Sequence, residues 1–283
     1  MDTLFGVVIL YNPTEEVFQN LASYSGALSK LYVFDNSEPA ANIDLGGLGS
    51  NIVLIADGVN RGISERLNAA ARMAIAEGGE WLLTMDQDSS FEKSEWENYH
   101  TCFSNFEGKE KVAMFGIEHE KKQEHNDTCS FEETDNLITS GSLVNLELFQ
   151  QLQGFDENLF IDEVDFEYCV RANTNGFQTV RFNNVNLNHS LGTASVHRSL
   201  KNLQTTSRTL HSAFRLYYMV RNFLYVRKKY TTSHSPTFKY KSKDIWNRIK
   251  NNLLYGNERI KVFQYVRLGF RHFKTNTMGR LRR

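Results

Sequence analysis

The sequence has few cysteines and no long apolar run. Its three cysteines, Cys102, Cys129 and Cys169, show neither a paired spacing nor the density of a disulfide scaffold, so we expect structural thiols in a reducing compartment. No stretch approaches the roughly 20 apolar residues that a membrane span requires. Met1 leads into the apolar run Leu4–Leu10 without a basic segment or a cleavage site. These absences predict a cytoplasmic protein, either free or peripheral on the inner face of the plasma membrane.

Three phosphate- or cofactor-binding signatures are also missing. The sequence has no Gly-x-Gly-x-x-Gly segment, which argues against a Rossmann oxidoreductase. It has no Gly-Asp step, which a phosphatase of the haloacid dehalogenase type would need. It has no glycine-rich loop with Arg or Lys near its N-terminus, which weakens, without excluding, a nucleotidyltransferase.

The net charge of -1 conceals a strong asymmetry along the chain. Residues 1–200 carry 12 Lys and Arg against 31 Asp and Glu, whereas residues 201–283 carry 20 against 2. One evenly mixed surface does not produce this division. We therefore predict a boundary near residue 200 and two functional parts, an acidic one over 1–200 and a basic one over 201–283.

Short β-rich runs alternate with helical patterns in the first part of the chain. Strands are predicted at Leu4–Leu10, Lys30–Phe34, Ile52–Ala56 and Trp81–Met85, and helices at Thr14–Ser25 and Ile63–Glu77. This α/β alternation predicts a mostly parallel central sheet with helices on both faces. Residues 118–136 are charged and are predicted to form a surface loop, either a lid or a solvated connector.

Beyond residue 200 the pattern becomes helical. Arg208, Arg215, Asn222 and Lys229 recur every seven residues, and a second basic and aromatic stretch spans Ile260–Lys274. The amphipathic helices either pack on the acidic domain or meet an anionic membrane surface. Near such a surface each Lys or Arg contributes about 1 kcal/mol.

Two acidic residues follow the apolar run Trp81–Met85, in the step Asp86-Gln87-Asp88. Open α/β sheets bind ligands beyond the carboxyl ends of their strands, and an Asp-x-Asp step there can hold a divalent cation and, through it, a diphosphate. An acidic pair in a turn is also often only a cap. His189 follows the strand-like run Val180–Leu187, and imidazole with carboxylates suits a Mn²⁺-like ion, although a lone histidine is more often structural.

A second acidic cluster spans Phe160–Glu167 and holds four carboxylates. If it opens a helix, the helix dipole favours anions at that end. Crowded carboxylates raise one another's pKa, which suits a general base. The alternative is an acidic helix N-terminus that is tied to Arg171 and has no catalytic role.

Taken in order, these motifs resemble the inverting family 2 glycosyltransferases, and most of all the bacterial rhamnosyltransferase branch. The resemblance covers about residues 4–230. The matching residues are Asp35, Asn60-Arg61-Gly62-Ile63-Ser64 to Asn68, Asp86-Gln87-Asp88, Thr139-Ser140-Gly141-Ser142, Gly154-Phe155-Asp156-Glu157, Phe160–Glu167 and His189-Ser190-Leu191-Gly192.

The resemblance implies a GT-A fold with a nucleotide-binding half over about 1–90, an acceptor-binding and catalytic half over 91–200, and the basic helical region after it. Asp35 would accept a hydrogen bond from the N3–H of a pyrimidine. The residues implied around the nucleoside and its sugar are Tyr11, Asn60, Gly62, Asn68 and Asp86, and those implied near the acceptor or the transferred sugar are Ser140 and Gly141.

The resemblance also implies the metal ligands and the base. Asp88, with Asp86 and His189, would hold Mg²⁺ or Mn²⁺ on the sugar diphosphate. Either Asp162 or Glu163 would deprotonate the acceptor hydroxyl, and Asp165 would orient the site. Direct displacement would invert the anomeric carbon.

The predicted function is sugar transfer from a dTDP- or UDP-sugar, with L-rhamnose from dTDP-rhamnose as the first choice, to a lipid-linked or soluble glycan of a surface polysaccharide. No nucleic-acid partner is expected. Two alternatives stay open, a nucleotidyltransferase that makes a nucleotide sugar and a non-enzymatic nucleic-acid-binding protein that uses the basic tail.

Overall fold

The chain folds as two compact units in a computed structural model. The model describes residues 2–118, 129–189, 195–198, 205–208, 210–230 and 236–282, with the backbone alone at 189, 195–198 and 205–208. The first unit comprises Met1–Glu157 and Val164–Ser190, and the second comprises Asn158–Glu163 and Leu191–Arg283. The predicted functional division into 1–200 and 201–283 stays a prediction.

The first unit is built on an eight-stranded sheet with the order β3-β2-β1-β4-β8-β6-β9-β7. Its strands are β1 (Leu4–Leu10), β2 (Lys30–Asp35), β3 (Ile52–Ile55), β4 (Trp81–Asp86), β6 (Val112–Glu118), β7 (Phe131–Glu133), β8 (Ser142–Asn145) and β9 (Gln178–Asn186). β1 to β4 run parallel, β8 is antiparallel to both β4 and β6, β6 and β9 are parallel, and β7 is antiparallel to β9.

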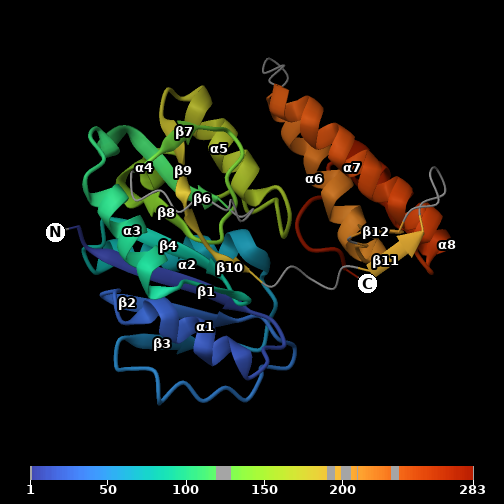
Figure 1. The fold of residues 1–283 in the computed structure, drawn as a ribbon. Helices are drawn as coiled ribbons and strands as arrows, with labels where there is room; N and C mark the ends of the chain where they lie inside the picture. The colour runs from blue at the N-terminus through green and yellow to red at the C-terminus, as the bar shows by residue number, and fades with distance from the viewer. Residues whose placement is uncertain are drawn as a thin grey trace. The chain divides into compact units, whose positions relative to one another are not determined.

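Helices cover both faces of this sheet (Figure 1). They are α1 (Glu16–Ser25), α2 (Gly62–Ala76), α3 (Lys93–Ser104), α4 (Leu146–Gln151) and α5 (Val164–Thr174). Apolar residues of α1 and α3 share one core cluster with alternate residues of the central strands. α2, α4 and α5 contact the strands but contribute nothing to that cluster, so they cover the opposite face. The predicted mostly parallel α/β sheet is confirmed.

Two sequence predictions, one for the cysteines and one for the loop over 118–136, are wrong. Cys102 and Cys129 form a disulfide, so only Cys169 is the buried free thiol that we expected of all three. The predicted loop over 118–136 contains the edge strand β7 (Phe131–Glu133), because backbone pairing with β9 orders this exposed segment although its sequence has no strand pattern. Residues 119–128 of the predicted loop lie outside the described part of the chain.

The second unit is mainly helical. It contains the hairpin of β11 (Ser195–Arg198) and β12 (Thr205–Arg208), followed by α6 (Ala213–Lys229), α7 (Pro236–Tyr255) and α8 (Arg259–Lys274). The predicted seven-residue basic repeat is therefore wrong at Arg208, which lies in a strand, since Ser212 caps α6 only later. None of the helices in the described residues has the length and apolarity needed to cross a bilayer.

Candidate functional site

Acidic residues gather at the carboxyl ends of the parallel strands. In the sheet register Leu10 of β1 is the partner of Asp35, and Ile9 is the partner of Asp86. Asp35 and Asp86 thus flank the end of β1 with their Cα atoms about 10 Å apart, the width of two strand spacings. Tyr11 follows β1 between them and is about half exposed. The structure therefore places these predicted nucleotide-binding residues on one edge of the sheet.

Gln87, the middle residue of the Asp86-Gln87-Asp88 step, fastens this step to the end of β1. Its Oε1 accepts a hydrogen bond from Tyr11 N at 2.8 Å, and its Nε2 donates to Tyr11 O at 3.3 Å. Its backbone oxygen accepts a further bond from Asn20 of α1 at 3.0 Å. The sequence prediction assigned no role to Gln87, because the pairing joins residues 76 positions apart.

His189 lies beside the same step. β5 (Ser89–Ser90) and β10 (Asn188–His189) form a two-stranded antiparallel ribbon in which His189 is the partner of Ser89. The backbone of His189 is thereby adjacent to the residue that follows Asp88. The His189 side chain lies outside the described residues, and the side chains that are described contain no group of three His, Cys, Asp or Glu residues that could hold a metal.

Ser140 and Gly141 also reach this edge, because Thr84 of β4 is the partner of Ser142 in β8. The buried Ser140 hydroxyl donates to Ser89 Oγ at 2.8 Å and accepts a long bond from Asp86 N at 3.4 Å. Gly141 has φ +72°, and a Cβ there would lie 2.5 Å from Cδ1 of Ile117. Only glycine fits this position without displacing a core side chain.

Asp35 is fully buried and holds the loop that follows β2. Its Oδ1 accepts a hydrogen bond from Ser37 N at 2.8 Å, and its Oδ2 accepts one from Ala41 N at 2.7 Å. Each carboxylate oxygen has a second lone pair, so the group retains acceptor capacity. The contact of Asp35 with a pyrimidine stays a prediction.

Asn60 and Asn68 serve the protein's own backbone in this structure. Asn60 Oδ1 accepts from Gly62 N at 3.0 Å, and Gly62 begins α2 with φ +80°. The buried Asn68 donates to Phe155 O at 2.9 Å and to Glu157 Oε1 at 2.8 Å, and accepts from Phe155 N at 2.8 Å. Asn68 therefore fixes the Phe155–Glu157 segment to α2, and its contact with a nucleoside stays a prediction.

Arg66 organises the loops near the predicted nucleoside site, and the sequence prediction missed it. Its buried guanidinium donates to Asn36 Oδ1 at 2.8 Å, to Asp57 Oδ1 at 2.6 Å and Oδ2 at 3.2 Å, and to Val59 O at 2.8 Å. The hydrogen bond from Arg66, helped by Arg61, holds the pKa of the Asp57 carboxyl well below its usual range. No local pattern marks these contacts, which join three separate segments.

Tyr24 of α1 is a second residue that the sequence prediction missed. Its hydroxyl is buried and makes no hydrogen bond within the described structure. Burial, and after it the negative charge of Asp86, raise the pKa of the Tyr24 hydroxyl far above its ordinary value. The phenol therefore stays protonated beside the acidic step.

The acidic cluster lies at the start of α5, as predicted. Asp162 and Glu163 belong to the second unit, whereas Asp165 lies in the first turn of α5 in the first unit and accepts from Phe166 N at 2.8 Å. The predicted tie to Arg171 exists for the fully buried Glu167, at 2.8 Å.

Asp162 and Glu163 adopt a strained backbone. Their φ angles are +64° and +65°, a left-handed conformation that side chains with a Cβ rarely adopt and that costs ~1–3 kcal/mol per residue. Both carboxylates are paired within the second unit: Asp162 Oδ1 with Arg215 Nε and Glu163 Oε2 with Lys241 Nζ, each at 3.2 Å. Strain of this kind persists where surrounding contacts enforce it, and it concentrates at functional sites.

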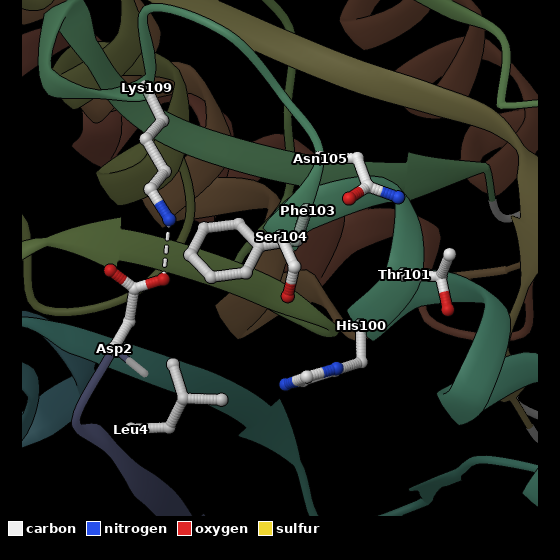
Figure 2. A pocket seen from close by; sticks show the side chains of 8 residues that line it. All are labelled: Asp2, Leu4, His100, Thr101, Phe103, Ser104, Asn105 and Lys109. Carbon is white, nitrogen blue, oxygen red and sulfur yellow. Dashed lines mark hydrogen bonds and ion pairs between the residues drawn. The ribbon is translucent and has the colours of Figure 1, made fainter.

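A separate hollow of about 530 Å³ opens at the start of β1, away from the strand ends that carry the acidic residues (Figure 2). His100 and Phe103 of α3 line it, together with Asp2 and Lys109. Lys109 and Asp2 form an ion pair with each other, and the Lys109 ammonium lies 4.9 Å from the centre of the Phe103 ring. The charged groups of this hollow are thus satisfied by one another.

The chain has an open, mostly parallel sheet with an acidic step at the end of β4, and this architecture is the GT-A fold. The chain is 25% identical over 281 aligned positions to the dTDP-rhamnosyl transferase RfbF of Shigella flexneri, which covers 92% of this chain and 90% of that one. No protein-family profile matches the chain. The resemblance that the ordered motifs predicted is confirmed.

Two solved structures have the same fold. The structure of residues 1-349 of S. aureus TarS in complex with UDP-GlcNAc aligns with a TM-score of 0.54 at 12% identity, over 96% of this chain and 80% of that one. The structure of GalNAc-T7 with UDP, GalNAc and Mn²⁺ aligns with a TM-score of 0.56 at 12% identity, over 98% of this chain and 56% of that one. At this identity the likeness shows the fold alone.

Proposed function

We propose that this chain is a glycosyltransferase that moves a sugar from a nucleotide-sugar donor to a hydroxyl group of a glycan during surface polysaccharide synthesis. The observation that carries the proposal is the edge at the end of β4, where Asp86, Asp88 and the backbone of His189 lie side by side. The similarity to RfbF over most of both chains supports it and favours dTDP-rhamnose as the donor, with other dTDP- and UDP-sugars as alternatives.

A divalent cation is part of the proposal. Asp86 and Asp88 are half-buried, and carboxylates with an imidazole from the adjacent strand are a donor set that suits Mn²⁺ or Mg²⁺. Asp88 and His189 would hold the ion, with Asp86 nearer the nucleoside sugar. The ion would neutralise the charge that develops on the departing diphosphate.

The nucleoside would lie over the ends of β1 and β2. Asp35 would accept a hydrogen bond from the N3–H of the pyrimidine, which dTDP and UDP share, so this contact does not distinguish them. Tyr11, Asn60, Gly62 and Asn68 would surround the nucleoside, and Ser140 and Gly141 would lie near the transferred sugar. The protonated Tyr24 beside Asp86 is a further hydrogen-bond donor in this region.

The reaction we propose is a single displacement. The acceptor O–H bond breaks and its proton passes to the carboxylate of Asp162 or Glu163, with Asp165 orienting the site. The acceptor oxygen then bonds to the anomeric carbon while the bond to the diphosphate oxygen breaks, and that electron pair leaves with the nucleoside diphosphate. Attack from the opposite face inverts the anomeric carbon.

The acceptor we propose is a glycan, soluble or carried on a lipid in the membrane. The second unit presents basic and aromatic side chains on α7 and α8, which favour contact with an anionic membrane surface. The protein would accordingly work in the cytoplasm, at the inner face of the plasma membrane. No contact with nucleic acid is proposed, because the acidic strand ends would repel its phosphates.

A donor panel tests this proposal. The purified chain with Mn²⁺ is incubated with dTDP-rhamnose, other dTDP-sugars and UDP-sugars, and both nucleoside diphosphate release and thermal stabilisation are measured. We expect one donor to raise the melting temperature and to be turned over. Asp88→Asn should reduce turnover at least a hundredfold, because the cation that stabilises the leaving group would be lost.

Glu97→Gln, which changes an exposed acid on α3, is the matched control and should behave like the unsubstituted chain. If no nucleotide sugar stabilises the protein, and if Asp88→Asn has no effect, the proposed donor site is wrong.

A further inference from the structure

Residues of α6, α7 and the C-terminal segment contact the turn at Phe160–Glu163. Phe160 stacks on Tyr218 of α6, with ring centres 5.5 Å apart, and the Arg280 guanidinium of the C-terminal segment lies 5.9 Å from the centre of the Phe160 ring. These contacts fix the position of the turn. The carboxylates of Asp162 and Glu163 are held by other residues, Arg215 and Lys241.

Asn222 of α6 fixes the backbone of the turn. Its side chain is fully buried, and its Nδ2 donates to Ile161 O at 2.7 Å and to Asp162 O at 3.1 Å. Its Oδ1 accepts from Arg221 Nε at 3.0 Å, which determines the orientation of the amide. One amide group thus enforces the left-handed conformation that points the two acidic side chains to different partners.

The two carboxylates differ in the cations that hold them. Arg215 of α6 contacts Asp162 through Nε alone, and about half of the Arg215 side chain is exposed. Lys241 of α7, which contacts Glu163, is only 19% exposed. His211 also lies beside Arg215, and burial, followed by the charges of Arg248 and Arg215, lowers the pKa of the His211 imidazole. Of these two cations, Arg215 is the more exposed and can move away more easily to admit a substrate.

We infer that Asp162 is the general base, that Arg215 is the positioning residue that aims its carboxylate, and that the Lys241–Glu163 pair anchors the turn without taking part in proton transfer. This inference rests on the proposed function. Arg215 holds the Asp162 carboxylate in one orientation between turnovers. The exposed guanidinium then releases one carboxylate oxygen to the acceptor hydroxyl.

Removal of each cation separately tests the assignment. In Arg215→Met, Asp162 loses the charge that favours its ionised form, so we expect the acidic limb of the kcat profile to move upward by about one pH unit. We expect kcat at neutral pH to fall about tenfold, while KM for the donor stays unchanged. In Arg215→Lys, which keeps the positive charge, the acidic limb should lie close to its position in the unsubstituted chain. Lys241→Met should leave the limb in place although it lowers thermal stability.

Arg227→Met, which removes an exposed arginine from the last turn of α6, is the control and should leave the profile unchanged. The assignment is overturned if Lys241→Met moves the acidic limb of the kcat profile, whether or not Arg215→Met also moves it. It is overturned as well if neither substitution moves the limb. Turnover by the unsubstituted chain separates this failure from failure of the proposed function, in which no donor is consumed at any pH.

Discussion

Arg66 contributes to stability as a buried donor that joins separate loop segments. It is buried above the Phe34 ring, 5.2 Å from the ring centre, and its donors bind Asn36, Asp57 and Val59. Removal of one partner from such a network leaves buried acceptors without donors, which costs more than the bonds themselves contribute. The two loops that follow β2 and β3 therefore depend on one side chain.

Arg66→Met should lower the free energy of unfolding by about 3 kcal/mol, because Asn36, Asp57 and Val59 all lose the buried Arg66 guanidinium as a donor. Urea denaturation at pH 7 measures this change. Arg72→Met, which removes an exposed arginine of the same helix, is the control and should change the free energy by less than about 0.5 kcal/mol. An equal effect of both substitutions would contradict the role of the network.

The same pair predicts a dependence of stability on pH. The folded state lowers the pKa of Asp57 from its ordinary value of 3.8, with the hydrogen bond from Arg66 as the largest cause. The contribution of Asp57 is therefore complete above the unfolded pKa and is lost as the pH falls below about 4. Denaturation at pH 3 should consequently show a smaller difference between Arg66→Met and the unsubstituted chain than at pH 7.

The sequence predicts the site residues that lie at the carboxyl ends of the strands. Asp35, Asp86 and Asp88 could be placed because a residue that follows a buried parallel strand must lie at the carboxyl edge of the sheet. The partners could not be placed in this way. Arg215 is 53 positions from Asp162 and Lys241 is 78 positions from Glu163, and no local periodicity encodes either contact.

At the scale of elements, α8 packs against α6 through a glycine. A Cβ at Gly269 would lie 2.9 Å from the carbonyl oxygen of Tyr217, closer than real side chains approach a backbone atom. Helix propensity alone would favour alanine at this position by about 1 kcal/mol. Because the two backbones approach so closely, we expect alanine at this position to destabilise the protein rather than to stabilise it.

Gly269→Ala should lower the melting temperature of the second unit, because α8 must move away from α6 to make room for the new methyl group. Thermal unfolding followed by circular dichroism measures the change. Gln264→Ala, at an exposed position of the same helix, should leave stability unchanged or raise it slightly. A higher melting temperature for Gly269→Ala would show that the two helices do not pack as described.

Element boundaries could be predicted where burial is continuous. Six of the seven residues of β1 are buried, and this strand is found where its apolar run lies. β7 could not be predicted, because all three of its residues are exposed and the strand is defined by backbone pairing with β9. Likewise, the Cys102–Cys129 disulfide joins residues 27 positions apart that only the tertiary fold brings together.

At the scale of the molecule, the basic half of the chain carries an outward face of mixed character. Exposed apolar and basic residues follow one another along α8 at helical spacing: Ile260, Phe263, Arg267, Phe270 and Lys274. α8 packs against α6 and α7, and its buried residues, Val262 and Gly269, lie on the other side of the helix. Such a face suits a helix that lies in the headgroup region of an anionic bilayer.

The chain should bind vesicles that contain anionic lipid, and raised salt should weaken this binding. Ile260→Ser combined with Phe263→Ser should reduce binding roughly tenfold or more, because two apolar side chains no longer enter the interface. Cosedimentation with anionic and with neutral vesicles measures both effects. Phe131→Ser, at an exposed phenylalanine of the first unit, is the control. Binding that neither salt nor the double substitution changes would contradict a membrane role for α8.

The two bonds between Gln87 and the backbone of Tyr11 make the end of β1 and the Asp86-Gln87-Asp88 step move as one body. In the proposed function, a nucleoside held against Tyr11 would therefore restrain the acidic step, and an ion held by Asp88 would restrain Tyr11. By thermodynamic linkage the two ligands assist each other by the same factor. Nucleotide and cation would then enter this edge of the sheet as cooperative partners, with Gln87 as the mechanical coupling between them.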